Sequence, residues 1–169
     1  IITVEFPNPV QEYELIPEDI PLDILFEDDH LIVVNKAAGM VVHPGHGNRT
    51  GTLVNALVHH FKELPKNTQF GIPRPGLIHR LDKNTSGVMV IGKTEQAMTH
   101  LSNQFFERST ERRYNALVWG RVEEEGTVQG HIGRSLKDRK VMSVFPEGEH
   151  GKHAVTHYKP LEPLQYVSL

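Results

Sequence analysis

The 169-residue sequence contains no cysteine. That absence excludes disulfide bonds and thiolate metal sites, and it is compatible with the reducing cytoplasm, where we expect the protein to act. No apolar run is long enough to cross a membrane, so we expect no membrane partner. The first residues lack both an initiator Met and the basic start of a signal peptide, so we expect the chain to be part of a longer one.

Positive charge is absent from residues 1–35, which contain nine acidic residues and no Lys or Arg. The basic residues concentrate instead in residues 71–121 and 131–145. The formal net charge of −3 does not suggest a nucleic-acid binder, but a basic region beside an acidic one can steer a polyanion. Ordinary solvated surface charge explains the same pattern equally well, so charge alone does not decide between the two interpretations.

Hydrophobic periodicity predicts more strands than helices. We expect two helices, one capped by Thr50 or Thr52 and one capped by Thr94. A Pro-rich linker is expected at 7–23. Expected strands cover residues 1–6, 24–35 with an acidic turn, 40–42, 88–91, 114–119, 141–144, 154–158 and 165–169. Because strands and helices do not alternate regularly, the sequence predicts an α+β fold with a mixed, mainly antiparallel sheet and flanking helices.

The run 79–87, which reads His-Arg-Leu-Asp-Lys-Asn-Thr-Ser-Gly, is the most informative part of the chain. Composition alone makes Asp82 a turn or capping residue. However, neighbouring cations favour the ionised form of this carboxylate, and it lies directly before a predicted strand. A single carboxylate held in that way can act as a nucleophile or as a general base.

The same run resembles the H-R-L-D-x-x-T-S-G signature of the RluA family of pseudouridine synthases. Further blocks that resemble this family follow in its order, so that the similarity spans residues 24–169; they are 26–36, 40–48, 74–78, 113–120 and 151–158. The block at 40–48 resembles the RluD-like branch, which modifies large-subunit ribosomal RNA. One small departure is Ala37, which stands where the family usually has proline.

The resemblance also implies a domain organisation. Residues 1–6 resemble the last strand of an S4-like RNA-binding domain, residues 7–23 form the linker, and residues 24–169 form the catalytic domain. We expect this domain to be incomplete, because the family continues to a T-G-R-x-H-Q-I-R-x-H block that carries an active-site basic residue.

The resemblance implies isomerisation of uridine to pseudouridine with no cofactor and no metal, in large-subunit RNA. We expect the protein to be a monomer. Asp82 takes the role of the catalytic carboxylate, and Tyr114 takes that of the active-site tyrosine on the base. Arg80 either fills the space left by a flipped base or binds its phosphate. The other expected RNA contacts are His79, Lys36, His43, Arg112, Arg113, Arg134, Lys137, Arg139 and Lys140.

Plainer interpretations stand beside these roles. Tyr114 is also a typical core aromatic, Arg80 a typical partner in a salt bridge, and each other basic residue a typical surface charge. A non-catalytic RNA-binding module is the competing function, and a hydrolase that uses His79 and Asp82 is a remote one. The segment 45–52 has the wrong spacing for a phosphate loop, and no H-E-x-x-H motif supports a metal site.

Overall fold

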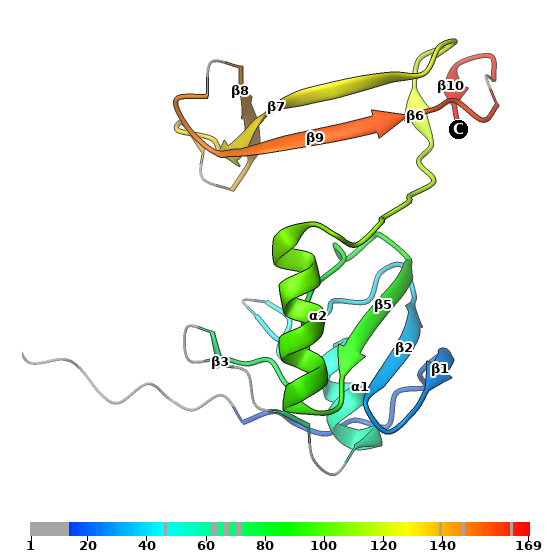
Figure 1. Ribbon diagram of the computed structural model, residues 1–169. Helices are drawn as coiled ribbons and strands as arrows, with labels where there is room; N and C mark the ends of the chain where they lie inside the picture. Colours follow the sequence, from blue (N-terminus) through cyan, green and yellow to red (C-terminus); the bar gives the residue numbers. More distant parts are fainter. Residues whose placement is uncertain are drawn as a thin grey trace, which may run out of the picture. The chain divides into compact units, whose positions relative to one another are not determined.

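The computed structural model describes residues 14–45, 47–61, 64–65, 68–69, 72–138, 140–146, 148–162 and 164–169. The chain divides into two compact units, Ile1–Glu111 and Arg112–Leu169, and each is described by itself. Figure 1 labels their helices and strands. The strand expected at 1–6 and the first part of the expected linker lie outside the described residues.

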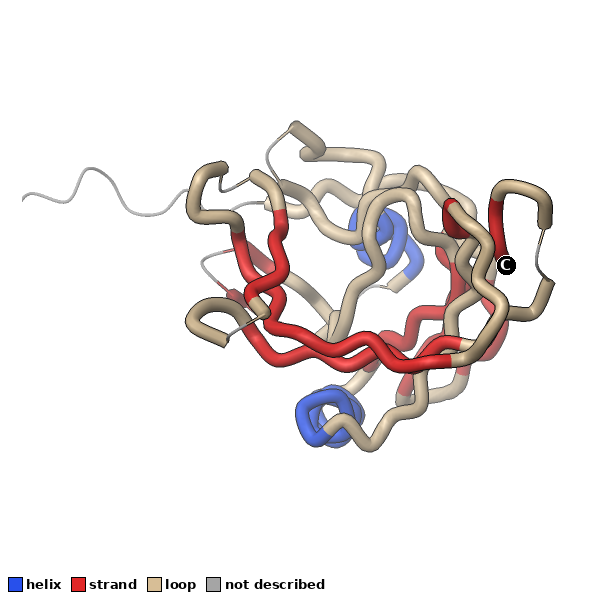
Figure 2. The backbone as a smooth tube through the Cα atoms, turned by 90° about the horizontal axis from the view of Figure 1, so that it is seen from above, coloured by secondary structure: helices blue, strands red, loops and turns tan. Residues whose placement is uncertain are grey.

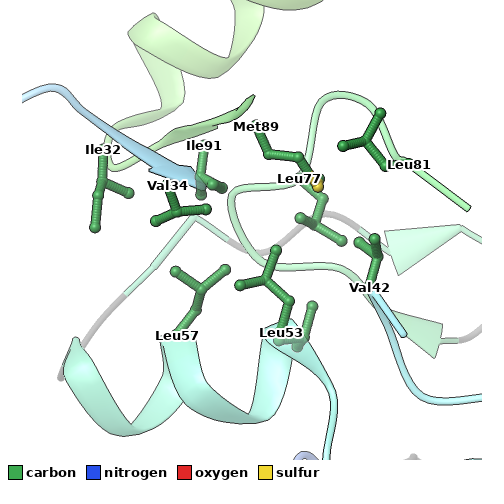
Figure 3. Close-up of a cluster of buried hydrophobic side chains, with 10 residues drawn as sticks. Ile32, Val34, Val42, Leu53, Leu57, Leu77, Leu81, Met89 and Ile91 are labelled. Atoms are coloured by element: carbon green, nitrogen blue, oxygen red, sulfur yellow. The ribbon is translucent and has the colours of Figure 1, made fainter. Parts of the chain in front are cut away.

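The first unit is built on an antiparallel three-stranded sheet with the order β1-β2-β5. Helices α1 and α2 lie on opposite faces of this sheet (Figures 1 and 3). A short hairpin, β3 with β4, precedes β5. The bounds are β1 Ile24–Glu27, β2 Leu31–Lys36, α1 Leu53–His60, β3 Thr68–Gln69, β4 Ile72–Pro73, β5 Gly87–Gly92 and α2 Glu95–Glu107.

The core of this unit lies between the sheet and α1. Alternate residues of a strand point to the same face, so Ile32 and Val34 of β2 are buried together with Met89 and Ile91 of β5. Figure 3 shows these side chains facing α1, with the side chains of Val42, Leu77 and Leu81 at one end of the cluster. Burial of each large apolar side chain contributes about 1.5–3 kcal/mol.

Both helices begin at the threonines that capping rules favour. The Thr52 hydroxyl accepts a hydrogen bond from the Asn55 N–H at 3.4 Å, and the Asn55 side chain accepts one from the Thr52 N–H at 3.1 Å. Thr94 caps α2 by accepting from the Ala97 N–H at 3.1 Å. The two predicted helices are therefore confirmed, and Thr52 rather than Thr50 is the first cap.

The described part of the Pro-rich segment, residues 14–23, packs along the first unit. The Glu18 carboxylate accepts from the Gly51 N–H at 2.6 Å, and the Asn55 side chain donates to the Ile16 carbonyl at 2.8 Å. Leu15 and Leu22 pack against the core cluster. These residues are therefore extended, as a linker would be, but they are attached to the domain beside them.

The second unit contains a three-stranded antiparallel sheet with the order β8-β7-β9. Figure 2 shows β7 and β9 running side by side along their length. A separate strand pair joins β6 to β10. The bounds are β6 Val118–Trp119, β7 Gly126–Arg134, β8 Met142–Phe145, β9 Lys152–Tyr158 and β10 Val167–Ser168.

The α+β class with mainly antiparallel strands is confirmed, and three expectations about strands are corrected. Residues 40–42 form only a single bridge, from Val41 to Thr52. Of residues 114–119 only the last two are a strand, because among the described residues only β10 pairs with them. The longest strand, β7, was not expected. Within the described ranges, no helix has both the length and the apolar character that a membrane span requires.

Candidate active site

The signature segment alternates between anchored and exposed side chains. Leu81 is 7% exposed and belongs to the core cluster, and His79 is half-buried. The residues between and after them, Arg80 and Asp82, are exposed. The segment is thus held by every second side chain, and it presents a guanidinium and a carboxylate to solvent two positions apart.

His79 connects the signature to both β5 and α2. Its Nε2 accepts a hydrogen bond from the Val90 N–H at 3.1 Å, so this nitrogen carries no proton and the neutral ring is protonated at Nδ1. The ring stacks on Phe105, with centroids 4.5 Å apart and planes 14° from parallel. The Nε2 atom is therefore already engaged in the fold, and contact between His79 and RNA stays a prediction.

The backbone after Asp82 is fixed at the Lys83 carbonyl. This oxygen accepts from the Gly39 N–H at 2.8 Å and from the Lys36 ammonium at 3.2 Å. The Asp82 carbonyl itself accepts from the Thr85 N–H at 3.1 Å, which closes a turn. The carboxylate of Asp82 therefore extends from a backbone that is held immediately before it, at Leu81, and immediately after it.

Lys36 lies in the interior, not on the binding surface where the sequence placed it. Its side chain is 1% exposed, and its ammonium also donates to the carbonyls of Ala37 and Met40, both at 2.9 Å. Burial lowers the pKa of Lys36, while the negative charge of Asp82 acts in the opposite direction. The Lys36 ammonium therefore clamps three backbone carbonyls and places a positive charge near Asp82. Its side chain has no exposed surface that RNA could contact.

His43 is half-buried in the loop between β2 and α1, and both of its ring nitrogens are buried without a hydrogen-bond partner in the described part of the chain. Burial lowers the pKa of His43 most strongly. Its own carbonyl opposes that effect, and the charges of Arg74 and Arg80 reinforce it. Sequence reasoning assigned no role to Arg74; the signal was its place directly before Pro75 and Gly76, ahead of the signature.

Glycine is needed where the signature enters β5. Gly87 has a φ of 130°, in the region that side-chain-bearing residues rarely adopt. It pairs with Lys36 across the sheet, so the end of the signature and the clamp residue are neighbours on adjacent strands.

The second unit carries the other predicted residues. Tyr114 follows Arg112 and Arg113 in a segment without regular structure, and all three line a groove of about 1080 Å³. Tyr114 is 61% exposed, so within this unit it is not the packed core aromatic of the plainer interpretation. Trp119, at the end of β6, is 88% exposed.

The remaining basic residues lie at the far end of the same unit. Arg134 ends β7, and Lys137 and Lys140 are exposed in the turn that leads to β8. The groove contains the opposite end of β7, at Gly126. Nine residues of strand separate the two ends by roughly 26 Å. These residues therefore do not form one cluster with Arg112 and Arg113. Arg139 lies outside the described residues.

The described residues hold no group of three or more His, Asp or Glu that could bind a metal ion. At the signature, the first unit presents the exposed carboxylate of Asp82, with the positive charge of the buried Lys36 nearby.

Comparison with known proteins identifies relatives of this chain. Residues 30–166 match the family described as RNA pseudouridylate synthase. An uncharacterized RNA pseudouridine synthase from Chlorobaculum parvum is 52% identical over 158 residues, which cover 92% of this chain and 48% of the relative. Ribosomal large subunit pseudouridine synthase D from Zymomonas mobilis is 47% identical over 167 residues, which cover 99% and 52%.

The chain therefore spans about half the length of these curated relatives. A solved structure, human RNA Pseudouridylate Synthase Domain Containing 1, has the same fold, with a TM-score of 0.59 at 21% identity over 97% of this chain and 60% of that chain. The matched residues include the whole signature and the segment that carries Tyr114. This chain belongs to the RNA pseudouridylate synthase family.

Proposed function

We propose that the protein isomerises uridine to pseudouridine in RNA, with Asp82 as the catalytic carboxylate. The observation that supports this most strongly is the exposed carboxylate of Asp82 on a backbone held at Leu81 and Lys83, within a signature that lies inside the family match. A catalytic group must be held on a rigid element while it remains accessible to substrate, and Asp82 meets both conditions.

The reaction is an exchange of one bond for another. The bond from uracil N1 to the ribose C1′ breaks, the base rotates, and a bond forms from C5 to C1′, after which C5 loses its proton and N1 gains one. Asp82 acts at the sugar, as a nucleophile or as a base. The departing uracil carries negative charge, which nearby cations such as Arg80 stabilise.

Tyr114 is the proposed second catalytic residue. Its ring stacks on the extruded uracil, and its hydroxyl moves the C5 proton. Its exposure in the second unit supports this role, since a ring buried in a core would have no access to a base. The flipped base costs a few kcal/mol to extract from the RNA stack, and stacking on an aromatic ring recovers part of that cost.

Large-subunit ribosomal RNA is the proposed substrate. Support comes from the relative in Zymomonas mobilis and from a second protein of the same name in Xylella fastidiosa, which is 50% identical over 146 residues. The basic residues Arg112 and Arg113 of the groove are proposed to contact phosphates, which position RNA without reading its sequence.

The test uses the protein produced from its complete gene and ribosomal RNA labelled with tritium at uracil C5. Formation of the C5–C1′ bond releases the label to water, so we expect release from large-subunit RNA and little from small-subunit RNA. Nucleoside analysis should show pseudouridine, and the RNA should keep its length. Shortened RNA would instead indicate a hydrolase, and RNA binding without release would indicate a binding module.

A further inference from the structure

Tyr158, the last residue of β9, is an aromatic residue that the proposed chemistry does not use. It pairs with Gly126 at the start of β7, so the two residues lie on the same face of the sheet. A Cβ atom on Gly126 would lie 2.5 Å from the Tyr158 hydroxyl oxygen and 2.8 Å from its Cζ atom. The outer part of the phenol ring therefore lies across the glycine, and the absence of a side chain there gives the ring its room.

The same residue is accessible from the groove of the second unit. Tyr158 is 42% exposed, and it lines the groove together with Tyr114, which is 61% exposed. Cover for a strand glycine is a sufficient structural role for one side of the ring, but it leaves the rest of the ring at the groove surface. One groove thus presents two tyrosines to solvent.

The charges of this groove favour a polyanion. Among the described residues that line it, Arg112, Arg113 and Lys159 are cationic, whereas Glu125 is the one acidic residue. The groove volume of about 1080 Å³ is above the roughly 300–1000 Å³ typical of a site for one small ligand, so it has room for more than one nucleotide. Aromatic rings in a positively charged groove are the usual arrangement of sites for single-stranded nucleic acid.

We propose that Tyr158 stacks on a second base of the substrate RNA, in an unpaired nucleotide close to the uridine that reacts. This inference rests on the proposed function, which assigns the reacting uracil to Tyr114 and phosphate contacts to Arg112 and Arg113. Tyr158 adds a stacking surface for a neighbouring base, and Lys159, the next residue, adds a cation for the phosphate of that nucleotide. Because every base has an aromatic face, this contact selects single-stranded RNA without reading its sequence.

The test separates the bases of the RNA from its backbone. The probes are a short oligouridylate and an abasic RNA of the same length, which carries the same phosphates without bases, titrated into the protein from its complete gene. Tyr158→Leu keeps an apolar side chain beside Gly126 but removes the aromatic face. We expect this variant to bind the oligouridylate about tenfold more weakly and the abasic RNA as tightly as the wild type does. Tyr158→Phe keeps the ring and should retain the affinity for both probes.

Tyr166→Leu is the matched control. Tyr166 is 70% exposed in the same unit, but it is not among the described residues that line the groove. This variant should bind both probes as the wild type does. Equal weakening of both probes by Tyr158→Leu would indicate that the ring only supports the fold, and unchanged binding of the oligouridylate would show that no base stacks there. Either result overturns the proposal.

A kinetic measurement covers ribosomal RNA itself. A stack on a base that does not react contributes equally to the bound substrate and to the transition state, so Tyr158→Leu should raise the KM for RNA about tenfold and leave kcat nearly unchanged. A fall in kcat at unchanged KM would contradict the proposal. Absence of tritium release by the wild type would overturn the proposed reaction, whereas the oligouridylate titration would still test the stacking site.

Discussion

The ammonium of Lys36 on β2 donates a hydrogen bond to the carbonyl oxygen of Lys83, the residue directly after Asp82, over 3.2 Å. The Gly39 N–H donates to the same oxygen at 2.8 Å. Lys36 of the first sheet thus holds the backbone of the signature segment, while the side chain of Asp82 is exposed. We expect the buried lysine to act as a positioning residue for this segment.

Replacement of Lys36 with Met tests that role. Met fills a similar volume, but three carbonyl oxygens lose the lysine as a donor. The Lys83 carbonyl keeps the Gly39 N–H and the Ala37 carbonyl keeps the Met40 N–H, so the main cost falls on the Met40 carbonyl and on the weakened hold of the other two. We expect the free energy of unfolding to fall by about 2 kcal/mol and turnover to fall more than RNA affinity does. Urea unfolding and steady-state kinetics measure the two effects.

Lys83→Met is the matched control for this change. The Lys83 side chain is exposed, and only its backbone carbonyl takes part in the clamp, so its replacement should leave stability within about 0.5 kcal/mol of the wild type. Equal stability of the two variants would show that Lys36 does not support the signature segment.

His79→Phe separates a positioning role from an RNA contact. Phe keeps the stack on Phe105 but leaves the Val90 N–H without its acceptor, so stability should fall by about 1–2 kcal/mol while RNA affinity stays nearly constant. Thermal unfolding and an RNA-binding titration provide the measurements, with His59→Phe as the control. A loss of RNA affinity at unchanged stability would favour direct contact between His79 and RNA.

Glu27 gives the first unit a pH-dependent contribution to stability. A hydrogen bond from Lys93 at 2.8 Å is the main cause that lowers the pKa of Glu27, burial opposes it, and His60 adds to the lowering. The unfolded chain therefore binds the proton more readily than the folded one. The contribution is complete above pH 4.5, the ordinary value for this carboxyl, and is lost as pH falls through the lowered pKa.

The Glu27→Gln variant should accordingly be less stable than the wild type by about 1 kcal/mol at neutral pH. The difference should disappear at a pH low enough to protonate Glu27 of the wild type in both the folded and the unfolded chain. Urea unfolding at a series of pH values measures this difference. Asp29→Asn, an exposed change in the adjoining turn, is the control, and its free energy of unfolding at neutral pH should stay within about 0.5 kcal/mol of the wild type. A stability difference that does not vary with pH would contradict the role given to the ion pair with Lys93.

The elements set by local patterns were predictable. The two capped helices, the β1–β2 hairpin and the apolar run of β5 each follow from residues that are close in sequence. β7 was missed because its sequence contains three glycines and few residues typical of strands. Its pairing with β9 is a long-range contact, and at Gly133 a Cβ would lie 2.8 Å from the Gly151 Cα, so the chain needs glycine there.

The position of Lys36 was predictable in principle. Ile32 and Val34 are buried on one face of β2, and the two-residue period of a strand places Lys36 on that same face. A charged residue at the end of such a pattern indicates a buried charge with backbone partners. The influence of the Arg74 charge on His43 was not predictable, because 31 positions separate the two residues in the sequence.

The central claim is that Asp82 performs the chemistry, and the most direct measurement compares tritium release from C5-labelled large-subunit RNA by the wild type and by Asp82→Asn. The substitution preserves the size of the side chain and removes its charge. We expect release to fall by at least about 100-fold while RNA binding and the free energy of unfolding remain near the wild-type values. The control Asp29→Asn should release tritium at the wild-type rate. Normal release by a folded Asp82→Asn protein would show that Asp82 is not the catalytic carboxylate.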